Sequence, residues 1–243
     1  MPSEIFDMTR RKNEAVDEAY KVLRTNIQFY EQQNQIKVIT VTSYGKGEGK
    51  STIAKNLAIS MAKSGKKVLL VDADLRKPGM FKTSEETDLK GLSDYVLGNV
   101  SMEDIINKTA VEGLYFISSG TKPPNPAELI GLPKFNELLN SAKEQFDMAI
   151  FDTPPLGSVI DCAIIAAQTD GVIIVVEQGA VKYGNVMLVK DQLEKVNARI
   201  LGTVLNKVSK SDYKKYYKYY DYYKNKKALR RAGKELKMKA SQR

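Results

Sequence analysis

The sequence predicts an α/β fold in which a mainly parallel β-sheet is covered by helices on both faces. Most of the predicted strands are continuous β-branched and aliphatic runs, the pattern of strands that are buried on both sides. These runs alternate with segments of helical periodicity, as in parallel strands joined by crossover helices. At 243 residues the chain suits one such domain.

The first predicted element is an amphipathic helix over residues 14–30, ahead of the core fold. Its apolar residues recur at helical spacing. They are Ala15, Ala19, Val22, Leu23 and Ile27.

The remaining elements alternate between residues 36 and 208, which we predict to form the main domain of the chain. The strands are expected at 36–43, 66–74, 114–120, 148–155, 171–178 and 200–208. The helices are expected at 50–65, near 91–97, near 101–107, and at 133–145, 159–168 and 182–195.

Residues 209–243 differ from the body in composition, and we predict a flexible tail rich in tyrosine and lysine. From Lys207 to Arg243 there are 14 basic and 3 acidic residues, a net charge of +11, whereas residues 1–206 carry a net charge of −2. Seven tyrosines fall between positions 213 and 223. Such a tail is compatible with nucleic acid, with an anionic membrane surface, or with solubility alone.

The composition excludes several classes of site. The chain has no histidine, which removes Ser-His-Asp triads and His-ligated metals. Cys162 is the only cysteine, which excludes an internal disulfide and a cysteine-rich metal cage within one chain. No run approaches the roughly 18 apolar residues of a membrane span, and no signal peptide opens the sequence, so we expect a cytoplasmic protein.

A glycine-rich segment, TSYGKGEGKST at 42–52, lies between the first predicted strand of the body and its helix. Its glycines allow backbone N–H groups to turn toward phosphate oxygens, and the helix N-terminus adds its partial positive charge. We therefore predict a nucleotide site formed by Gly45, Lys46, Gly47, Glu48, Gly49, Lys50, Ser51 and Thr52.

Two side chains of this segment have the roles of a P-loop. Lys50 can reach the β- and γ-phosphates, and Ser51 can hold Mg²⁺. The standard spacing places glycine at position 44, where this chain has Tyr44.

Three aspartates follow predicted strands that flank the P-loop unit. Asp72 and Asp74 end one strand and Asp152 ends another. Carboxylates at the carboxyl ends of parallel strands point into the crevice where ligands bind in open α/β sheets. Near a triphosphate they would hold Mg²⁺, directly or through its waters, and one could accept a proton from an attacking hydroxyl.

Together these motifs resemble those of the bacterial tyrosine kinases of the capsule and exopolysaccharide type, the BY-kinases. The resemblance runs from about Glu18 to the C-terminal tyrosines. The Walker A, Walker A′ and Walker B motifs of that family resemble residues 43–52, 68–78 and 148–155.

The phrases that connect these motifs are more specific than the motifs themselves. They resemble the family pattern in GLSDYVLG (91–98), SSGTKPPNPAELIG (118–131) and DTPPLGSVID (152–161).

The resemblance also implies subunit contacts within residues 1–35. The helix of the family that carries Glu-x-x-Arg-x-x-Arg resembles Glu18, Lys21 and Arg24, with lysine where the first arginine is usual. Lysine keeps the charge but cannot form a bidentate pair with a carboxylate. Two further positions bear on nucleotide binding. Lys46 stands where proline is frequent in the family. Asn206 matches an adenine-contacting position of related ATPases, but it is equally explained as a turn residue at the end of a strand.

The resemblance implies an ATP- and Mg²⁺-dependent protein-tyrosine kinase that regulates capsular or extracellular polysaccharide synthesis and export. Lys50, Asp72, Asp74 and Asp152 would be catalytic, with Ser51, Asp74 and Asp152 around the metal. Asp72 is the better candidate for orienting or deprotonating the acceptor phenol, although its division of labour with Asp74 stays open. The implied autophosphorylation sites are Tyr213, Tyr216, Tyr217, Tyr219, Tyr220, Tyr222 and Tyr223.

The implied partners follow from the two-chain form of the family. A transmembrane polysaccharide co-polymerase, or chain-length adaptor, would activate the kinase and hold it at the inner face of the cell membrane. The chain would form a ring-like homo-oligomer that phosphorylates in trans, and a cognate tyrosine phosphatase would reset it. Enzymes of polysaccharide synthesis would be further substrates, and no nucleic-acid partner is expected.

Four alternatives compete with this interpretation. Partition and cell-division-site ATPases carry a signature lysine five residues before the P-loop lysine, where this chain has Gly45. Relatives of the nitrogenase iron protein need two cysteines per subunit. A nucleic-acid-binding arm would stack tail tyrosines on bases, and an aromatic helix docked on the body is the plainest structural explanation of the tail.

Overall fold

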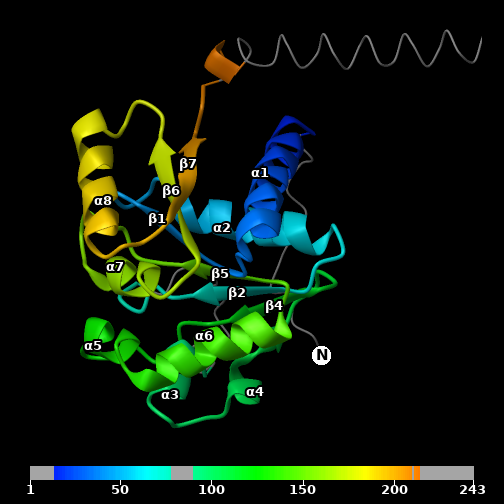
Figure 1. The fold of residues 1–243 in the computed structure, drawn as a ribbon, viewed down its shortest axis with the longest axis vertical. Coiled ribbons are helices and arrows are strands. Elements are labelled where there is room, and N and C mark those ends of the chain that lie inside the picture. The colour runs from blue at the N-terminus through cyan, green and yellow to red at the C-terminus, as the bar shows by residue number, and fades with distance from the viewer. Residues whose placement is uncertain (1–13, 78–89, 210, 214–243) are drawn as a thin grey trace, which may run out of the picture. The chain divides into compact units, whose positions relative to one another are not determined.

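A computed structural model of the chain describes residues 14–77, 90–209 and 211–213. The chain divides into two units, Met1–Asn206 and Lys207–Arg243. The first unit contains the sheet and the helices named below (Figure 1). In the second unit, residues 211–213 form a helical turn in which the Tyr213 amide donates to the Ser209 carbonyl at 2.9 Å.

One seven-stranded sheet forms the centre of the first unit, in the order β3-β4-β2-β5-β1-β6-β7. Every neighbouring pair is parallel except β3 and β4, so the predicted mainly parallel sheet is confirmed. The strands are β1 (Val38–Ser43), β2 (Val68–Asp72), β3 (Asn107–Lys108), β4 (Leu114–Ile117), β5 (Met148–Asp152), β6 (Gly171–Glu177) and β7 (Ile200–Asn206).

Eight helices accompany the sheet in the described ranges, and none of them is long and apolar enough to cross a bilayer. They are α1 (Glu14–Asn34), α2 (Lys50–Ala62), α3 (Leu92–Val96), α4 (Met102–Ile105), α5 (Pro126–Ile130), α6 (Pro133–Gln145), α7 (Asp161–Ala166) and α8 (Tyr183–Lys195).

The helices cover both faces of the sheet, as predicted (Figure 1). On one face, Ile27 of α1 and Leu57 of α2 join a core with Ile39 of β1. On the other face, Phe135 of α6 joins a core with Phe151 of β5, while α7 and α8 pack against β6. All residues of β1, β2 and β5 are buried, in agreement with their mainly aliphatic and β-branched sequences. The buried residues include the polar Thr40, Thr42 and Ser43 of β1 and the aspartates that end β2 and β5.

Three local expectations were wrong. The helix expected near 101–107 ends at Ile105, because Asn107 and Lys108 pair antiparallel with β4 at the sheet edge. The short helix α5 was not predicted, since five residues are too few to show a helical period. Val22 is exposed although its spacing placed it on the apolar face of α1.

The strand order determines where a ligand can bind. β1 lies between β5 and β6, and β5 lies between β1 and β2. The register pairs Asp152 with both Val41 and Asp72, so the carboxyl ends of these three strands lie side by side. Ligands of open α/β sheets bind outside such strand ends.

Candidate active site

The phosphate loop leaves β1 and leads directly into α2. Gly47 and Gly49 have φ angles of +84° and +96°, a left-handed conformation that favours glycine. The loop borders a cleft of about 540 Å³. Its lining residues are Lys46, Gly47, Gly49, Lys50, Ser51, Thr52, Asp74, Arg76, Lys77, Pro154, Pro155, Ser158 and Val159.

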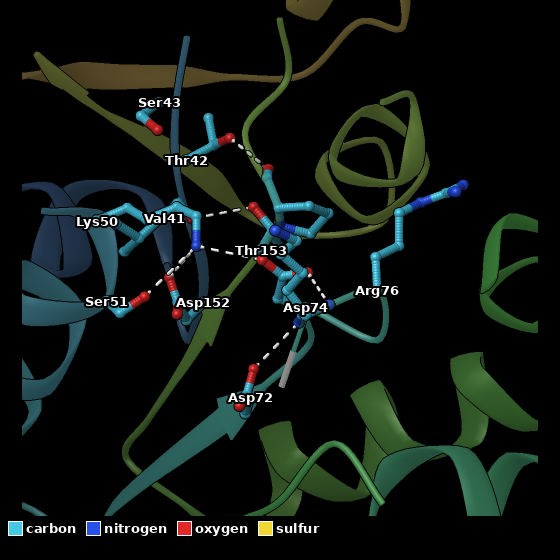
Figure 2. Close-up of polar contacts among 12 residues, drawn as sticks. Val41, Thr42, Ser43, Lys50, Ser51, Asp72, Asp74, Arg76, Asp152 and Thr153 are labelled. Atoms are coloured by element: carbon cyan, nitrogen blue, oxygen red, sulfur yellow. Dashed lines mark hydrogen bonds and ion pairs between the residues drawn. The ribbon is translucent and has the colours of Figure 1, made fainter. Parts of the chain in front are cut away.

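Lys50 lies among three oxygen-bearing side chains at the floor of this cleft. Its Nζ is 3.4 Å from Ser51 Oγ, 3.4 Å from Asp74 Oδ2 and 3.8 Å from Asp152 Oδ1 (Figure 2). All three distances are longer than the 2.7–2.9 Å of a strong charge-assisted hydrogen bond. The ammonium group is therefore held in place without being saturated, and a phosphate can take over its interactions.

Asp152 at the end of β5 is almost fully enclosed, with 1% of its surface exposed. Burial raises the pKa of its carboxyl to about 7, although Lys50 and Ser51 favour the charged form. Within the described residues, its Oδ1 has no hydrogen-bond partner. A buried carboxylate oxygen that lies 3.8 Å from Lys50 Nζ and has no hydrogen bond in the described structure fits a magnesium ion, which would supply a closer partner.

Asp72 and Asp74 are arranged differently (Figure 2). Asp74 contacts Lys50 and accepts a hydrogen bond from the Lys77 amide at 3.0 Å. Asp72 accepts one from the Asp74 amide at 3.2 Å. Within the described part of the chain, no group of three acidic or cysteine side chains is close enough to enclose a metal, so Mg²⁺ would need phosphate oxygens or water as further ligands.

Tyr44, the departure from the usual glycine, packs against the core formed by α7, α8 and β6. A Cβ on Gly157 would lie 2.5 Å from the Tyr44 carbonyl and 2.6 Å from its ring. The Gly157 amide also donates to that carbonyl at 3.0 Å. Glycine at 157 thus makes room for tyrosine at 44, and the loop keeps its path.

Two threonines join the loop's strand to the segment after β5. Thr42 Oγ1 donates to the Pro154 carbonyl at 3.1 Å, and Thr153 Oγ1 donates to the Val41 carbonyl at 2.9 Å (Figure 2). Cys162 is buried nearby, and burial raises the pKa of its thiol to about 11, so it stays protonated at neutral pH. The two hydrogen bonds therefore brace the end of β1 against the segment after β5, and the Cys162 thiol is unreactive at neutral pH.

Sequence reasoning missed a pair on the opposite wall of the cleft. Arg76 Nε and Nη2 donate to the two oxygens of Asp161 at 2.7 and 2.8 Å. Asp161 is 1% exposed, whereas the Arg76 side chain is 41% exposed and extends away from Lys50 (Figure 2). The position of Asp161 at the end of the DTPPLGSVID phrase was the available signal.

Hydrogen bonds join two of the connecting segments, residues 91–98 and 118–131. The Asp94 carboxylate accepts hydrogen bonds from the Gly91 amide at 2.9 Å and the Thr121 amide at 3.1 Å. Burial alone would raise the pKa of Asp94, but these bonds lower it below its ordinary value. Ser93 Oγ adds a bond to the Thr121 carbonyl at 2.6 Å.

The other predicted loop residues take distinct positions. Lys46 is exposed at the cleft, and Thr52 is exposed on the first turn of α2. Glu48 is buried, and its carboxylate accepts a hydrogen bond from the Gly45 amide. Asn206 Nδ2 donates to the Glu48 carbonyl at 2.8 Å.

The residues predicted to make subunit contacts lie on α1. Glu18 and Lys21 form an exposed pair at 3.2 Å. Arg24 instead turns inward, and its Nη1 donates to the Ser60 carbonyl of α2 at 2.7 Å. Of the predicted phosphoacceptors, only Tyr213 is described; the others, Tyr216, Tyr217, Tyr219, Tyr220, Tyr222 and Tyr223, lie outside the described residues.

Comparison with known proteins gives the family of the chain. Residues 36–206 match the family model described as an AAA domain. The chain is 43% identical over 209 residues to the tyrosine-protein kinase CpsD of Streptococcus agalactiae serotype Ia, a match that covers 86% of this chain and 89% of CpsD. The chain belongs to the bacterial tyrosine-protein kinase family. This BY-kinase is also 38% identical over 216 residues to the tyrosine-protein kinase YwqD of Bacillus subtilis strain 168, covering 88% and 91% of the two chains.

Solved structures agree with this assignment. The chimerical protein CapA2B2 is similar to this BY-kinase with a TM-score of 0.75 and 36% identity, covering 79% of this chain and 85% of the other. The kinase domain of Escherichia coli ETK gives 0.74 and 27%, covering 84% and 86%. The septum site-determining protein MinD of Pyrococcus horikoshii, complexed with Mg-ADP, gives 0.58 and 26%, covering 70% and 69%. The P-loop fold and the family predicted from the sequence are confirmed.

Proposed function

We propose that this BY-kinase transfers the γ-phosphoryl group of ATP to protein tyrosine, including the tyrosines of its own C-terminal segment. The observation that carries the proposal is the position of Lys50, loosely held between strand-end carboxylates in a cleft bordered by a phosphate loop. The acceptors on the chain itself are Tyr213, Tyr216, Tyr217, Tyr219, Tyr220, Tyr222 and Tyr223.

The loop and its lysine bind the nucleotide. Lys50 exchanges its long carboxylate contacts for the β- and γ-phosphates, while the backbone amides of the loop and the N-terminus of α2 stabilise their charge. Ser51, Asp74 and Asp152 would hold Mg²⁺, which when bound neutralises charge on the phosphates. The Oδ1 of Asp152, which has no hydrogen bond in the described structure, supports this assignment.

Asp72 orients the acceptor phenol or accepts its proton. It lies level with Asp152 at the end of the neighbouring strand, and the ion pairs of Lys50 within the described residues are with Asp74 and Asp152 rather than with Asp72. A phenol with a pKa near 10 needs only modest help, so positioning supplies most of the rate. Asp72→Asn should therefore lower kcat with little change in the KM for ATP, whereas Asp74→Asn should also weaken the response to Mg²⁺.

The partners of the kinase follow from its family. We propose that a membrane-embedded chain-length adaptor activates it and holds it at the inner face of the membrane. Similarity to a chimerical protein, CapA2B2, supports a kinase that works with a second polypeptide. We further propose that the subunits form a ring, contact one another through Glu18, Lys21 and Arg24, and phosphorylate each other in trans. A tyrosine phosphatase would reverse the modification, and the kinase would regulate polysaccharide synthesis and export.

Phosphotyrosine mapping tests the activity. The purified protein is incubated with Mg²⁺ and ATP, with and without the adaptor's cytoplasmic segment, beside Lys50→Met and a truncation after Ser209. We expect phosphotyrosine on the tail of the wild type and none in Lys50→Met. ATP hydrolysis without any phosphotyrosine would instead favour an ATPase of the partition type.

A further inference from the structure

A glutamate inside a phosphate-binding loop is electrostatically unexpected. Glu48 lies between the loop glycines and is only 3% exposed, so its charge lies inside the loop rather than in solvent. Its Oε1 accepts a hydrogen bond from the Gly45 amide within the loop, and its Oε2 faces the Glu177 amide of β6 at 3.4 Å. The Glu48 carboxylate therefore links Gly45, near the start of the loop, to Glu177, the last residue of β6.

The main chain of the same residue is held from the next strand. Asn206, the last residue of β7, donates from Nδ2 to the Glu48 carbonyl at 2.8 Å. Its own carbonyl accepts from the Gln178 amide at 2.9 Å, which secures it to the end of β6. A Cβ on Gly49 would collide with Asn206 Nδ2, so glycine at 49 is required by this contact as well as by its φ angle.

We propose that Glu48 and Asn206 are positioning residues that fix the phosphate loop to the carboxyl ends of β6 and β7. The loop is then preset for a polyphosphate before one binds, and the entropy of ordering it is paid during folding. This inference rests on the proposed nucleotide-binding role of the loop. In this proposal Asn206 maintains the loop conformation, whether or not it also contacts adenine. The side chain of Glu48 binds groups of the protein and does not contact the ligand.

The inference predicts a specific pattern for Glu48. Glu48→Ala leaves the Gly45 and Glu177 amides without their acceptor and should weaken binding of tripolyphosphate and of ADP alike, by about tenfold or more. Glu48→Gln keeps an acceptor oxygen for only one of the two amides and turns an NH2 donor toward the other, so its affinity should fall between that of Glu48→Ala and that of the wild type. In autophosphorylation, Glu48→Ala should raise the KM for ATP while kcat at saturation changes little.

Comparison of ligands with and without a base separates the two roles of Asn206. Asn206→Asp is isosteric but replaces the donor with an oxygen that faces the Glu48 carbonyl. If Asn206 positions the loop, Asn206→Asp and Asn206→Ala should weaken binding of tripolyphosphate as much as that of ADP. If Asn206 contacts only the base, tripolyphosphate binding should be unchanged in Asn206→Ala. This variant decides between the two roles, because Asn206→Asp also adds a negative charge that repels polyphosphate.

Calorimetric titration of the full chain with each ligand is the decisive measurement, with Glu144→Ala and Asn140→Ala on the exposed face of α6 as matched controls. Loss of tripolyphosphate affinity in Glu48→Ala and both Asn206 variants, with a smaller loss in Glu48→Gln and affinity retained in the controls, supports the proposal. Unchanged or tighter tripolyphosphate binding in these variants overturns it. A wild type that binds neither ligand would overturn the proposed function as well, and if Glu48→Ala does not fold, the Asn206 variants decide.

Discussion

Two of the cations that line the cleft, Arg76 and Lys50, differ in how well they are paired. Arg76 makes two hydrogen bonds of 2.7 and 2.8 Å to one buried carboxylate. Lys50 has contacts of 3.4 to 3.8 Å with three groups and leaves Asp152 Oδ1 without a hydrogen-bond partner in the described structure. A satisfied bidentate pair holds two segments together, whereas a loosely paired cation is available to a ligand. The geometry of the two pairs thus indicates that Arg76 has a structural role and that Lys50 is available to bind a ligand.

The largest effect is expected from the loosely paired cation. Lys50→Met removes the charge that meets the β- and γ-phosphates and should lower autophosphorylation by about 100-fold or more. Phosphotyrosine formed per minute at saturating ATP is the measurement. Lys63→Met, at the other end of α2 and exposed, is the control and should behave like the wild type. Comparable activity in the two variants would show that Lys50 does not serve the phosphates.

The satisfied pair should show its effect in stability. Arg76→Ala leaves the buried Asp161 carboxylate unpaired and should reduce the free energy of unfolding by about 2 to 3 kcal/mol, less than for a fully buried pair because Arg76 is partly exposed. Arg76→Lys should recover part of the loss without restoring the bidentate geometry. Urea unfolding measures both. Arg199→Ala, at an exposed position, is the control. An Arg76→Ala variant as stable as that control would show that the pair of Arg76 and Asp161 does not stabilise the fold.

A pH series tests the charge on Asp152. Because the pKa of Asp152 in the folded protein is about 7, the folded state keeps a proton that the unfolded state has released between about pH 4 and pH 7. Its contribution to stability is therefore present at low pH and is lost as the pH rises through 7. Nucleotide-free Asp152→Asn should melt several degrees above the wild type at pH 8, and this advantage should vanish near pH 4.

Thermal melts in EDTA at the two pH values measure that difference. Exposed Asp191→Asn on α8 is the control and should follow the wild type throughout. A wild type and an Asp152→Asn variant with parallel melting curves at all pH values would mean that burial does not perturb this carboxyl.

The smallest effect is expected on the surface of α1. The Glu18–Lys21 pair is exposed, so Lys21→Ala should change the free energy of unfolding by less than about 0.5 kcal/mol. Arg24→Ala, which breaks the bond to the Ser60 carbonyl, should cost about 1 kcal/mol. Urea unfolding of both variants side by side checks this order, and the reverse order would contradict the assignment of Arg24 to the fold.

Much of this architecture was accessible from the sequence, for a physical reason. Strands buried on both faces are continuous apolar runs, and a phosphate loop must stand between a strand and a helix. The aspartates could be placed because strand ends of a parallel sheet share an edge. The elements that escaped prediction, β3 and α5, are too short to show a period.

The contacts within the site were less accessible. Arg76 and Asp161 are 85 positions apart, and their pairing depends on how two loops meet. The same holds for Tyr44 and Gly157, where a missing side chain at one position accommodates a large one at the other. The buried carboxylate of Glu48 has no sequence signal, because a charged residue in a glycine-rich loop is expected to be solvated.

The central position of β5 limits how this chain can change in length. Because β5 pairs with β1 on one side and β2 on the other, a single inserted or deleted residue within Met148–Asp152 would turn its side chains to the opposite faces and lose both registers at once. Homologous kinases should therefore vary in length in their loops, while the residue count between Met148 and Asp152 stays fixed through evolution.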